Sequence, residues 1–230
     1  MSRGYILVEG HGEVTAAPNL ITRLWADLSL PHLSWARPIR PRGITSDGGV
    51  RRACEQLRAK DDVRAVLILR DDDDGCPQID GPALADTVRE LSLPFPVATV
   101  LAYREYESLF LASLPSLAGK NIKDASGMVR PGIAADAVFD GDPESIRDAK
   151  GWLSRHMPKG RKYKETLDQL PLTRMVDFGI VRNQGLPWFG TLERGLGHLA
   201  SAAPGEVGVY PPAPAKTAKE DDDQDAGRPS

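Results

Sequence analysis

Three groups of acidic residues each follow an apolar stretch of the chain. Glu9 and Glu13 follow "GYILV", the aspartates 71–74 follow "VRAVLILR", and Glu105 and Glu107 follow "FPVATVLAY". An apolar run bounded by polar residues is typical of a buried strand, and parallel strands all end at one edge of their sheet. We therefore expect the three acidic groups to converge at the carboxyl edge of one sheet, where parallel α/β proteins carry their functional sites.

The four consecutive aspartates are the strongest indication of metal chemistry. Neighbouring carboxylates repel one another, so this run requires either solvent or a cation to be stable. Carboxylates at positions i and i+2 of a strand end point to the same side and suit an oxygen-liganded Mg²⁺ or Mn²⁺ ion. The pair is either Asp71 with Asp73 or Asp72 with Asp74, and a solvated acidic turn is the alternative.

Other ion-binding and redox motifs do not fit the chain. If Gly75 is aligned with position 6 of an EF-hand loop, Arg70 falls at position 1 and Gly81 at position 12, so both carboxylate positions fail. Neither GxxxxGK[ST] nor GxGxxG follows this strand, which excludes a P-loop and a dinucleotide fingerprint. Cys54 and Cys76 have neither zinc-ligand nor redox-motif spacing.

Residues near the acidic groups supply further candidates. Glu9 is expected to lie across from the aspartates, within a turn made tight by the glycines on both sides of His11. His11 is a candidate general base, although a histidine in such a turn is more often structural. Glu105 and Glu107 lie at the expected start of a helix, where the helix dipole alone also favours carboxylates.

A basic segment, "KGRKYK", carries Lys159, Arg161, Lys162 and Lys164 around Tyr163. Lysine and arginine with an interleaved aromatic ring suit a nucleic-acid strand, although a solvated basic loop has the same composition. The formal net charge of −3 argues against a strongly basic nucleic-acid binder. Nucleic-acid binding would therefore depend on a local patch of this kind.

Hydrophobic periodicity predicts an α/β fold with a mainly parallel sheet flanked by helices. Buried strands are expected at residues 4–10, 63–70 and 95–103, and a short edge strand at 34–41. The predicted amphipathic helices lie at 18–28, 48–60, 81–92, 104–114, 142–157 (with Asp142 as N-cap) and 187–200, whereas 119–141 resemble a long loop.

These elements define three regions: an α/β core at 1–115, a mostly helical extension at 116–210 packed on it, and a disordered acidic tail at 211–230. We find neither a signal peptide nor an apolar run long enough to span a membrane, so we expect a cytoplasmic protein.

Taken together, five segments resemble the bacterial family catalogued as domain of unknown function 4276. This family is TOPRIM-like and distantly related to the overcoming-lysogenisation-defect nucleases. The segments are "LVEGHGEVTAAPNLITRLW", "VLILRDDDDGCP", "VLAYREYESLFLAS", "PESIRDAKGWLSRHM" and "YKETLDQLPLT", which together span roughly residues 5 to 173. The resemblance implies a TOPRIM-like Rossmannoid core with a C-terminal helical extension.

The resemblance also implies roles for individual residues. In such families, the glutamate after the first strand and an Asp-x-Asp pair hold Mg²⁺. By position these are Glu9, Asp71 and Asp73, with Glu13 as a helper; Asp72 stands where a small residue is expected, so the second aspartate pair stays open. Further motif members, without assigned roles, are Glu105, Glu107, Lys150, Tyr163 and Gln169.

The implied function is that of a Mg²⁺- or Mn²⁺-dependent nuclease acting as an effector in anti-phage defence. Glu13 or His11 would orient or activate the attacking water, and Lys150 would join the basic segment in binding nucleic acid. Because the chain has no ATPase motif, an ATPase partner would be a separate protein. The alternatives are a non-catalytic TOPRIM-like subunit that regulates or docks in an ATPase-containing complex, and another Mg²⁺-dependent phosphotransfer enzyme such as a phosphatase.

Overall fold

A four-stranded parallel sheet forms the centre of the computed structural model, which describes residues 2–124, 126–203 and 207–213. The strand order is β1-β2-β3-β6, and every neighbouring pair is parallel. The strands are β1 (Arg3–Val8), β2 (Val63–Asp72), β3 (Val97–Tyr103) and β6 (Val209–Tyr210). This confirms the predicted mixed α/β class, and β6 is an addition that the sequence pattern did not indicate.

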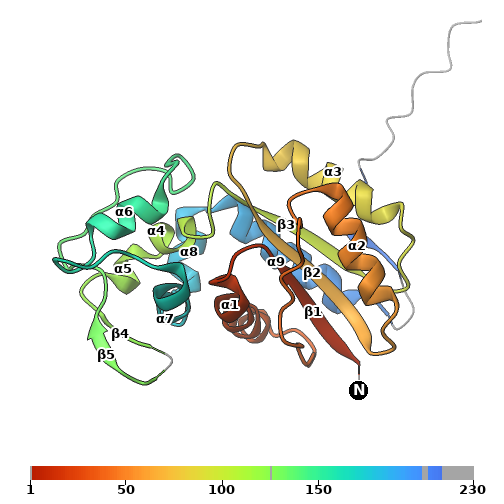
Figure 1. The fold of residues 1–230 in the computed structure, drawn as a ribbon, viewed down its shortest axis with the longest axis horizontal. Coiled ribbons are helices and arrows are strands. Elements are labelled where there is room, and N and C mark those ends of the chain that lie inside the picture. Colours follow the sequence, from red (N-terminus) through yellow and green to blue (C-terminus); the bar gives the residue numbers. More distant parts are fainter. Residues whose placement is uncertain (1, 125, 204–206, 214–230) are drawn as a thin grey trace, which may run out of the picture.

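Helices cover both faces of the sheet (Figure 1). Side chains alternate along β2, so that Leu67 packs on the face that carries α1 and α9, and Ile68 on the face that carries α2 and α3. Burial of each such side chain contributes roughly 1.5–3 kcal/mol. The helix bounds are α1 (Glu13–Asp27), α2 (Asp47–Arg58), α3 (Pro77–Arg89) and α9 (Pro187–Ser201).

A second, mostly helical region lies beside the sheet (Figure 1). Its apolar residues, such as Phe110 and Leu153, belong to the same hydrophobic cluster as Leu67 and Leu192, so this region packs directly on the core. The elements are α4 (Ser108–Ala112), α5 (Leu114–Leu117), β4 (Asn121–Lys123), β5 (Val129–Pro131), α6 (Ala149–Arg155), the π-helix η1 (Glu165–Gln169), α7 (Leu170–Thr173) and α8 (Phe178–Gln184).

The predicted helix start at Asp142 was wrong. The Asp142 carboxylate accepts the Glu144 N–H at 2.9 Å and thereby forms a separate turn. The true N-cap is Asp148, whose side chain accepts the Gly151 N–H at 2.7 Å. The helix that carries Lys150 therefore starts at Ala149, which fixes where this lysine points.

Three other local predictions differ from the structure. The stretch 119–141 is not only loop, because β4 and β5 form an antiparallel hairpin within it. The edge strand at 34–41 is reduced to two isolated bridges with β1, as its prolines suggest. The helix expected from residue 104 begins only at Ser108, because Arg104 has a φ of +65° and turns the chain first.

The tail expected at 211–230 lies outside the described residues from 214 onward. Within the described ranges, no helix is long and apolar enough to cross a lipid bilayer.

Candidate functional site

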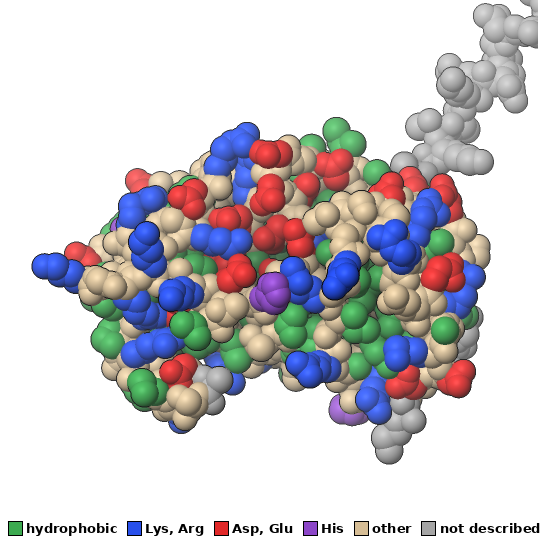
Figure 2. Space-filling view, in the orientation of Figure 1, with side chains coloured by type: hydrophobic (Ala, Val, Ile, Leu, Met, Phe, Trp, Pro, Cys, Tyr) green, Lys and Arg blue, Asp and Glu red, His purple; other side chains and the backbone are tan. Residues whose placement is uncertain are grey.

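The carboxyl edge of the sheet brings the three acidic groups together, as the parallel register requires. Glu9 directly follows β1, and Asp71 near the end of β2 pairs with Ala102 of β3. Figure 2 shows Asp and Glu side chains gathered near the middle of this face, with Lys and Arg side chains among them. We call the set around this edge the acidic cluster; it comprises Glu9, Glu13, Asp71, Glu105, Glu107 and Glu165.

Lys150 lies between the carboxylates of this cluster. Its Nζ is 3.3 Å from Glu105 Oε1, 3.7 Å from Glu107 Oε2, 3.9 Å from Glu165 Oε2 and 4.0 Å from Asp71 Oδ2. Burial alone would lower the pKa of Lys150, but the nearby carboxylates outweigh it and raise this pKa. The lysine is therefore a permanent positive charge at the centre of the cluster.

The pKa values of Asp71 and Glu107 are strongly raised within the cluster. Burial and the charges of Glu13 and Glu107 raise the pKa of Asp71 well above its usual value, while Asp71 Oδ1 accepts the Tyr106 N–H at 2.9 Å. Glu107 is fully buried, and burial raises its pKa to about 7. A cation that binds beside these two carboxyls would favour their charged forms and displace any proton that they hold.

Two motif residues of unassigned role hold Glu107 in place. The Tyr163 hydroxyl donates to Glu107 Oε1 at 2.7 Å, and Gln169 Nε2 donates to the same oxygen at 3.3 Å. The other oxygen, Glu107 Oε2, is buried and accepts no hydrogen bond within the described residues. One side of this carboxyl is thus fixed, and the other faces Lys150.

The turn after β1 is organised by Glu13. Glu13 Oε2 accepts the N–H groups of Glu9 at 3.2 Å and Gly10 at 3.0 Å, so this side chain closes the turn that carries Glu9. Burial raises the pKa of both acids, and the charge of Asp73 also raises that of Glu9. Glu9 Oε2 is a second buried oxygen without a hydrogen-bond partner among the described residues.

The structure separates the two aspartate pairs that the sequence left open. Asp71 and Asp73 both interact electrostatically with acids that follow β1. The charge of Glu13 raises the pKa of Asp71, and the charge of Asp73 raises the pKa of Glu9. Asp72 instead faces Asp80, as burial and this neighbour raise its pKa. Asp74 is exposed and forms ion pairs with arginines 104 and 147. The alternation favours Asp71 with Asp73 on the side of Glu9.

Other predicted site residues are placed differently. Tyr163 is buried, so its ring cannot stack on a nucleobase, and that part of the prediction was wrong. Arg161 pairs with the buried Asp168, which also binds Arg130, and so links the basic segment to β5. Exposed side chains remain at Lys159, Lys162 and Lys164. His11 is also exposed and, like them, contributes no ion pair within the described ranges.

Glu165 is a cluster member that the sequence reasoning missed. It directly follows the basic segment, in "YKETLDQ", so the sequence shows a carboxylate at this position. Nothing in its spacing indicated that a π-helix would turn it towards Lys150, at 3.9 Å.

The atoms that the cluster offers as ligands suit a divalent metal ion. It offers carboxylate oxygens, the ligands that Mg²⁺ and Mn²⁺ prefer, and two of these oxygens are buried without a hydrogen-bond partner. Within the described residues, no three His, Cys, Asp or Glu side chains form a ready-made metal site. Glu9 and Asp71 of the cluster would hold the ion together with Asp73, whose charge acts on Glu9 from outside the cluster.

We expect Gly12→Ala to destabilise the site, because Gly12 allows α1 to pack directly against η1. A Cβ at this position would lie 2.1 Å from Gln169 Oε1 and 3.0 Å from the Glu165 carbonyl oxygen. The expected loss is about 1–3 kcal/mol in the free energy of urea-induced unfolding. Gly197→Ala is the control, since nothing lies within 4 Å of its Cβ. Equal stability of the Gly12 variant and the wild type would contradict this packing.

The fold and site define a class: a three-layer α/β protein with an acidic cluster at the carboxyl edge of a parallel sheet. A family model described as "Domain of unknown function (DUF4276)" matches residues 8–197, and the chain belongs to this family. No curated protein and no solved structure shows significant similarity to the chain.

Proposed function

We propose that this protein is a Mg²⁺- or Mn²⁺-dependent, TOPRIM-like nuclease. The observation that supports this most strongly is the placement of Glu9, Asp71 and Asp73 at one edge of the sheet, where burial and neighbouring carboxylates raise the pKa values of Glu9 and Asp71. A bound divalent ion would supply Lewis-acid polarisation of a phosphodiester and lower the pKa of an attacking water. Sites that perturb carboxyl pKa values in this way are frequently functional.

The chain's own residues have distinct roles in this proposal. Glu13 fixes the turn that presents Glu9. Lys150 neutralises the inner carboxylates, and since its side chain is 38% exposed, its ammonium can also contact a substrate phosphate. Tyr163 and Gln169 position Glu107 and do not touch the substrate.

A basic surface beside the cluster supports nucleic acid as the substrate. Lys159, Lys162 and Lys164 are exposed, as are Lys120 and Lys123 on the neighbouring hairpin. Asp168 joins both segments through its ion pairs with arginines 130 and 161. Such a surface would hold the phosphate backbone in a salt-dependent manner.

We also propose that the protein acts together with a separate ATPase in anti-phage defence. This part of the proposal rests on the family resemblance. A second candidate function is a non-catalytic subunit with a regulatory or docking role. Lys150 favours this alternative, because it already supplies a positive charge inside the cluster where a metal ion would bind.

The test is incubation of the purified protein with single- and double-stranded DNA and RNA, with Mg²⁺, Mn²⁺ or EDTA. We expect cleavage of at least one polymer with metal and none with EDTA. Calorimetric titration with Mn²⁺ separates the alternatives: metal binding without cleavage would favour a regulatory subunit, and hydrolysis of a phosphomonoester alone would favour a phosphatase. Absence of both metal binding and cleavage would reject the nuclease.

A further inference from the structure

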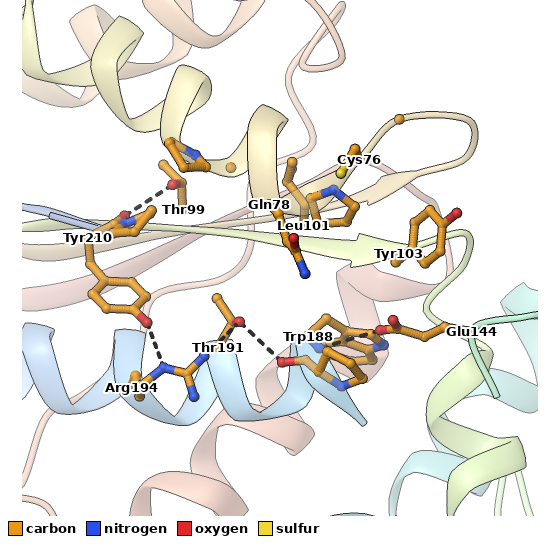
Figure 3. Close-up of a pocket in the computed structure, with 16 residues that line it drawn as sticks. Cys76, Gln78, Thr99, Leu101, Tyr103, Glu144, Trp188, Thr191, Arg194 and Tyr210 are labelled. Carbon is orange, nitrogen blue, oxygen red and sulfur yellow. Dashed lines mark hydrogen bonds between the residues drawn. The ribbon is translucent and has the colours of Figure 1, made fainter. Parts of the chain in front are cut away.

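A pocket of about 470 Å³ lies along the open edge of β3 (Figure 3). It exists because β6 pairs only with Val97 and Ala98, so that within the described residues no strand covers β3 from Thr99 to Tyr103. The pocket is lined from both sides of this edge, by residues of α3 and of α9. Its volume is within the range of small-molecule sites, roughly 300–1,000 Å³.

The middle of the pocket is apolar and aromatic. Figure 3 shows Leu101 and Trp188 between the two ends, with Tyr103 near one end and Tyr210 near the other. Prolines at the start of α3 and of α9 also line the wall. Trp188 and Leu101 are only 2% and 3% exposed, so the aromatic surfaces open to a ligand are the partly exposed rings of Tyr103 and Tyr210, which favour a planar aromatic ligand.

One end of the pocket carries a positive charge. Arg194 Nε donates to Tyr210 Oη at 2.9 Å, and Arg194 Nη2 donates to Thr191 Oγ1 at 3.1 Å. These bonds orient the guanidinium, which is exposed and has no carboxylate partner in the part of the chain that the structure describes. An oriented guanidinium without a counter-ion is suited to a phosphate or carboxylate group.

The opposite end carries a buried carboxyl group. Glu144 is 8% exposed, and its Oε1 accepts the backbone N–H of Trp188 at 3.4 Å. Burial raises its pKa to about 7, and no Lys or Arg among the described residues pairs with it. A buried carboxyl in a pocket without an ionic partner is a candidate recognition group, since it can accept N–H donors from a ligand.

We propose that this pocket binds a nucleoside monophosphate. Its phosphate would bind Arg194, its base would lie against the partly exposed ring of Tyr103, and N–H groups of the base would donate to Glu144. The site does not involve the acidic cluster and does not rest on the proposed nuclease activity.

The test is calorimetric titration of the full chain with dAMP, dGMP, dCMP and dTMP, in EDTA so that no metal-dependent reaction intervenes. We expect at least one of the four to bind saturably. Arg194→Ala and Glu144→Gln should each weaken binding about tenfold or more, because each removes a charged partner. Arg51→Ala on α2, remote from the pocket, should leave binding unchanged.

Gly81 provides a matched pair of variants that removes no polar contact. It lines the pocket, and a Cβ there would meet nothing within 4 Å. Gly81→Ala should bind like the wild type, and Gly81→Phe should fill the pocket and abolish binding while thermal unfolding shows an intact fold. The proposal would be overturned if no nucleotide bound at millimolar concentration, if Gly81→Phe and Arg194→Ala bound normally, or if inorganic phosphate bound as tightly as every nucleotide.

Discussion

Asp71→Asn is expected to lower the rate of metal-dependent cleavage by about 10²–10³-fold, the size of effect seen when a single charge-stabilising group is removed from an active site. Asp71 is the candidate ligand placed deepest in the acidic cluster, with a side chain that is 13% exposed. Asparagine keeps an oxygen that can accept the Tyr106 N–H but removes the negative charge that a divalent ion requires. The measurement is single-turnover cleavage at fixed Mg²⁺ or Mn²⁺ concentration.

The same variant is expected to be at least as stable as the wild type. Burial raises the pKa of Asp71, so its charged form costs free energy in the folded state. A neutral amide of the same shape avoids this cost, and loss of activity would then have no explanation in misfolding. Asp74→Asn is the control, since Asp74 is exposed and pairs with arginines outside the cluster. Equal cleavage by the two variants would contradict the assignment of Asp71.

The strands and the convergence of acids were predictable because both follow from local pattern and a general rule. The runs that became β1, β2 and β3 are apolar at consecutive positions, and parallel strands must end at one edge. From this alone, Glu9 and Asp71 could be placed at the same edge. The sequence could not decide between Asp71 with Asp73 and Asp72 with Asp74. A shift of one residue in strand register turns every side chain to the opposite face of the sheet, and the register is known only from the structure.

The C-terminal contributions were not predictable, because they depend on contacts between distant segments. Tyr163 lies in a basic sequence, yet a hydrogen bond to a glutamate 56 positions earlier places it in the core. The Lys150 position depends on Asp148 capping α6, where Asp142 offered an equally good N-cap signal. Glu144 occupies a pocket that exists only because a two-residue strand, β6, stops at Tyr210.

The second large effect is expected from Lys150→Met, which removes the positive charge but keeps the length of the side chain. Four carboxylates lie within 4.0 Å of the ammonium, and removing it leaves them to repel one another. Removal of one partner of a fully buried ion pair costs about 3–5 kcal/mol. Because the Lys150 side chain is 38% exposed, solvent screens part of this, and we expect a loss of about 1–3 kcal/mol at pH 8.

This loss should depend on pH in a defined direction. The pKa of Glu107 is about 7 in the folded protein, against 4.5 for an unperturbed glutamate, and Lys150 acts to lower it. Without the lysine, the Glu107 carboxyl keeps its proton in the folded state to a still higher pH. The folded state then binds more protons than the unfolded state, so the free energy of unfolding falls as pH rises from about 4.5 through 7 and beyond. Urea unfolding should therefore show a small difference between variant and wild type near pH 4.5 and a large one at pH 8.

Two matched variants and one added ion separate the effect of the Lys150 charge from that of metal binding. Lys150→Arg keeps the charge and should retain most of the stability, and Lys159→Met removes an exposed charge and should have little effect. If the cluster binds a divalent ion, Mn²⁺ should raise the unfolding temperature of Lys150→Met more than that of the wild type, because the ion replaces the missing positive charge. A Lys150→Met protein as stable as the wild type at pH 8 would refute the charge balance, whereas absence of any Mn²⁺ effect would refute only the metal site.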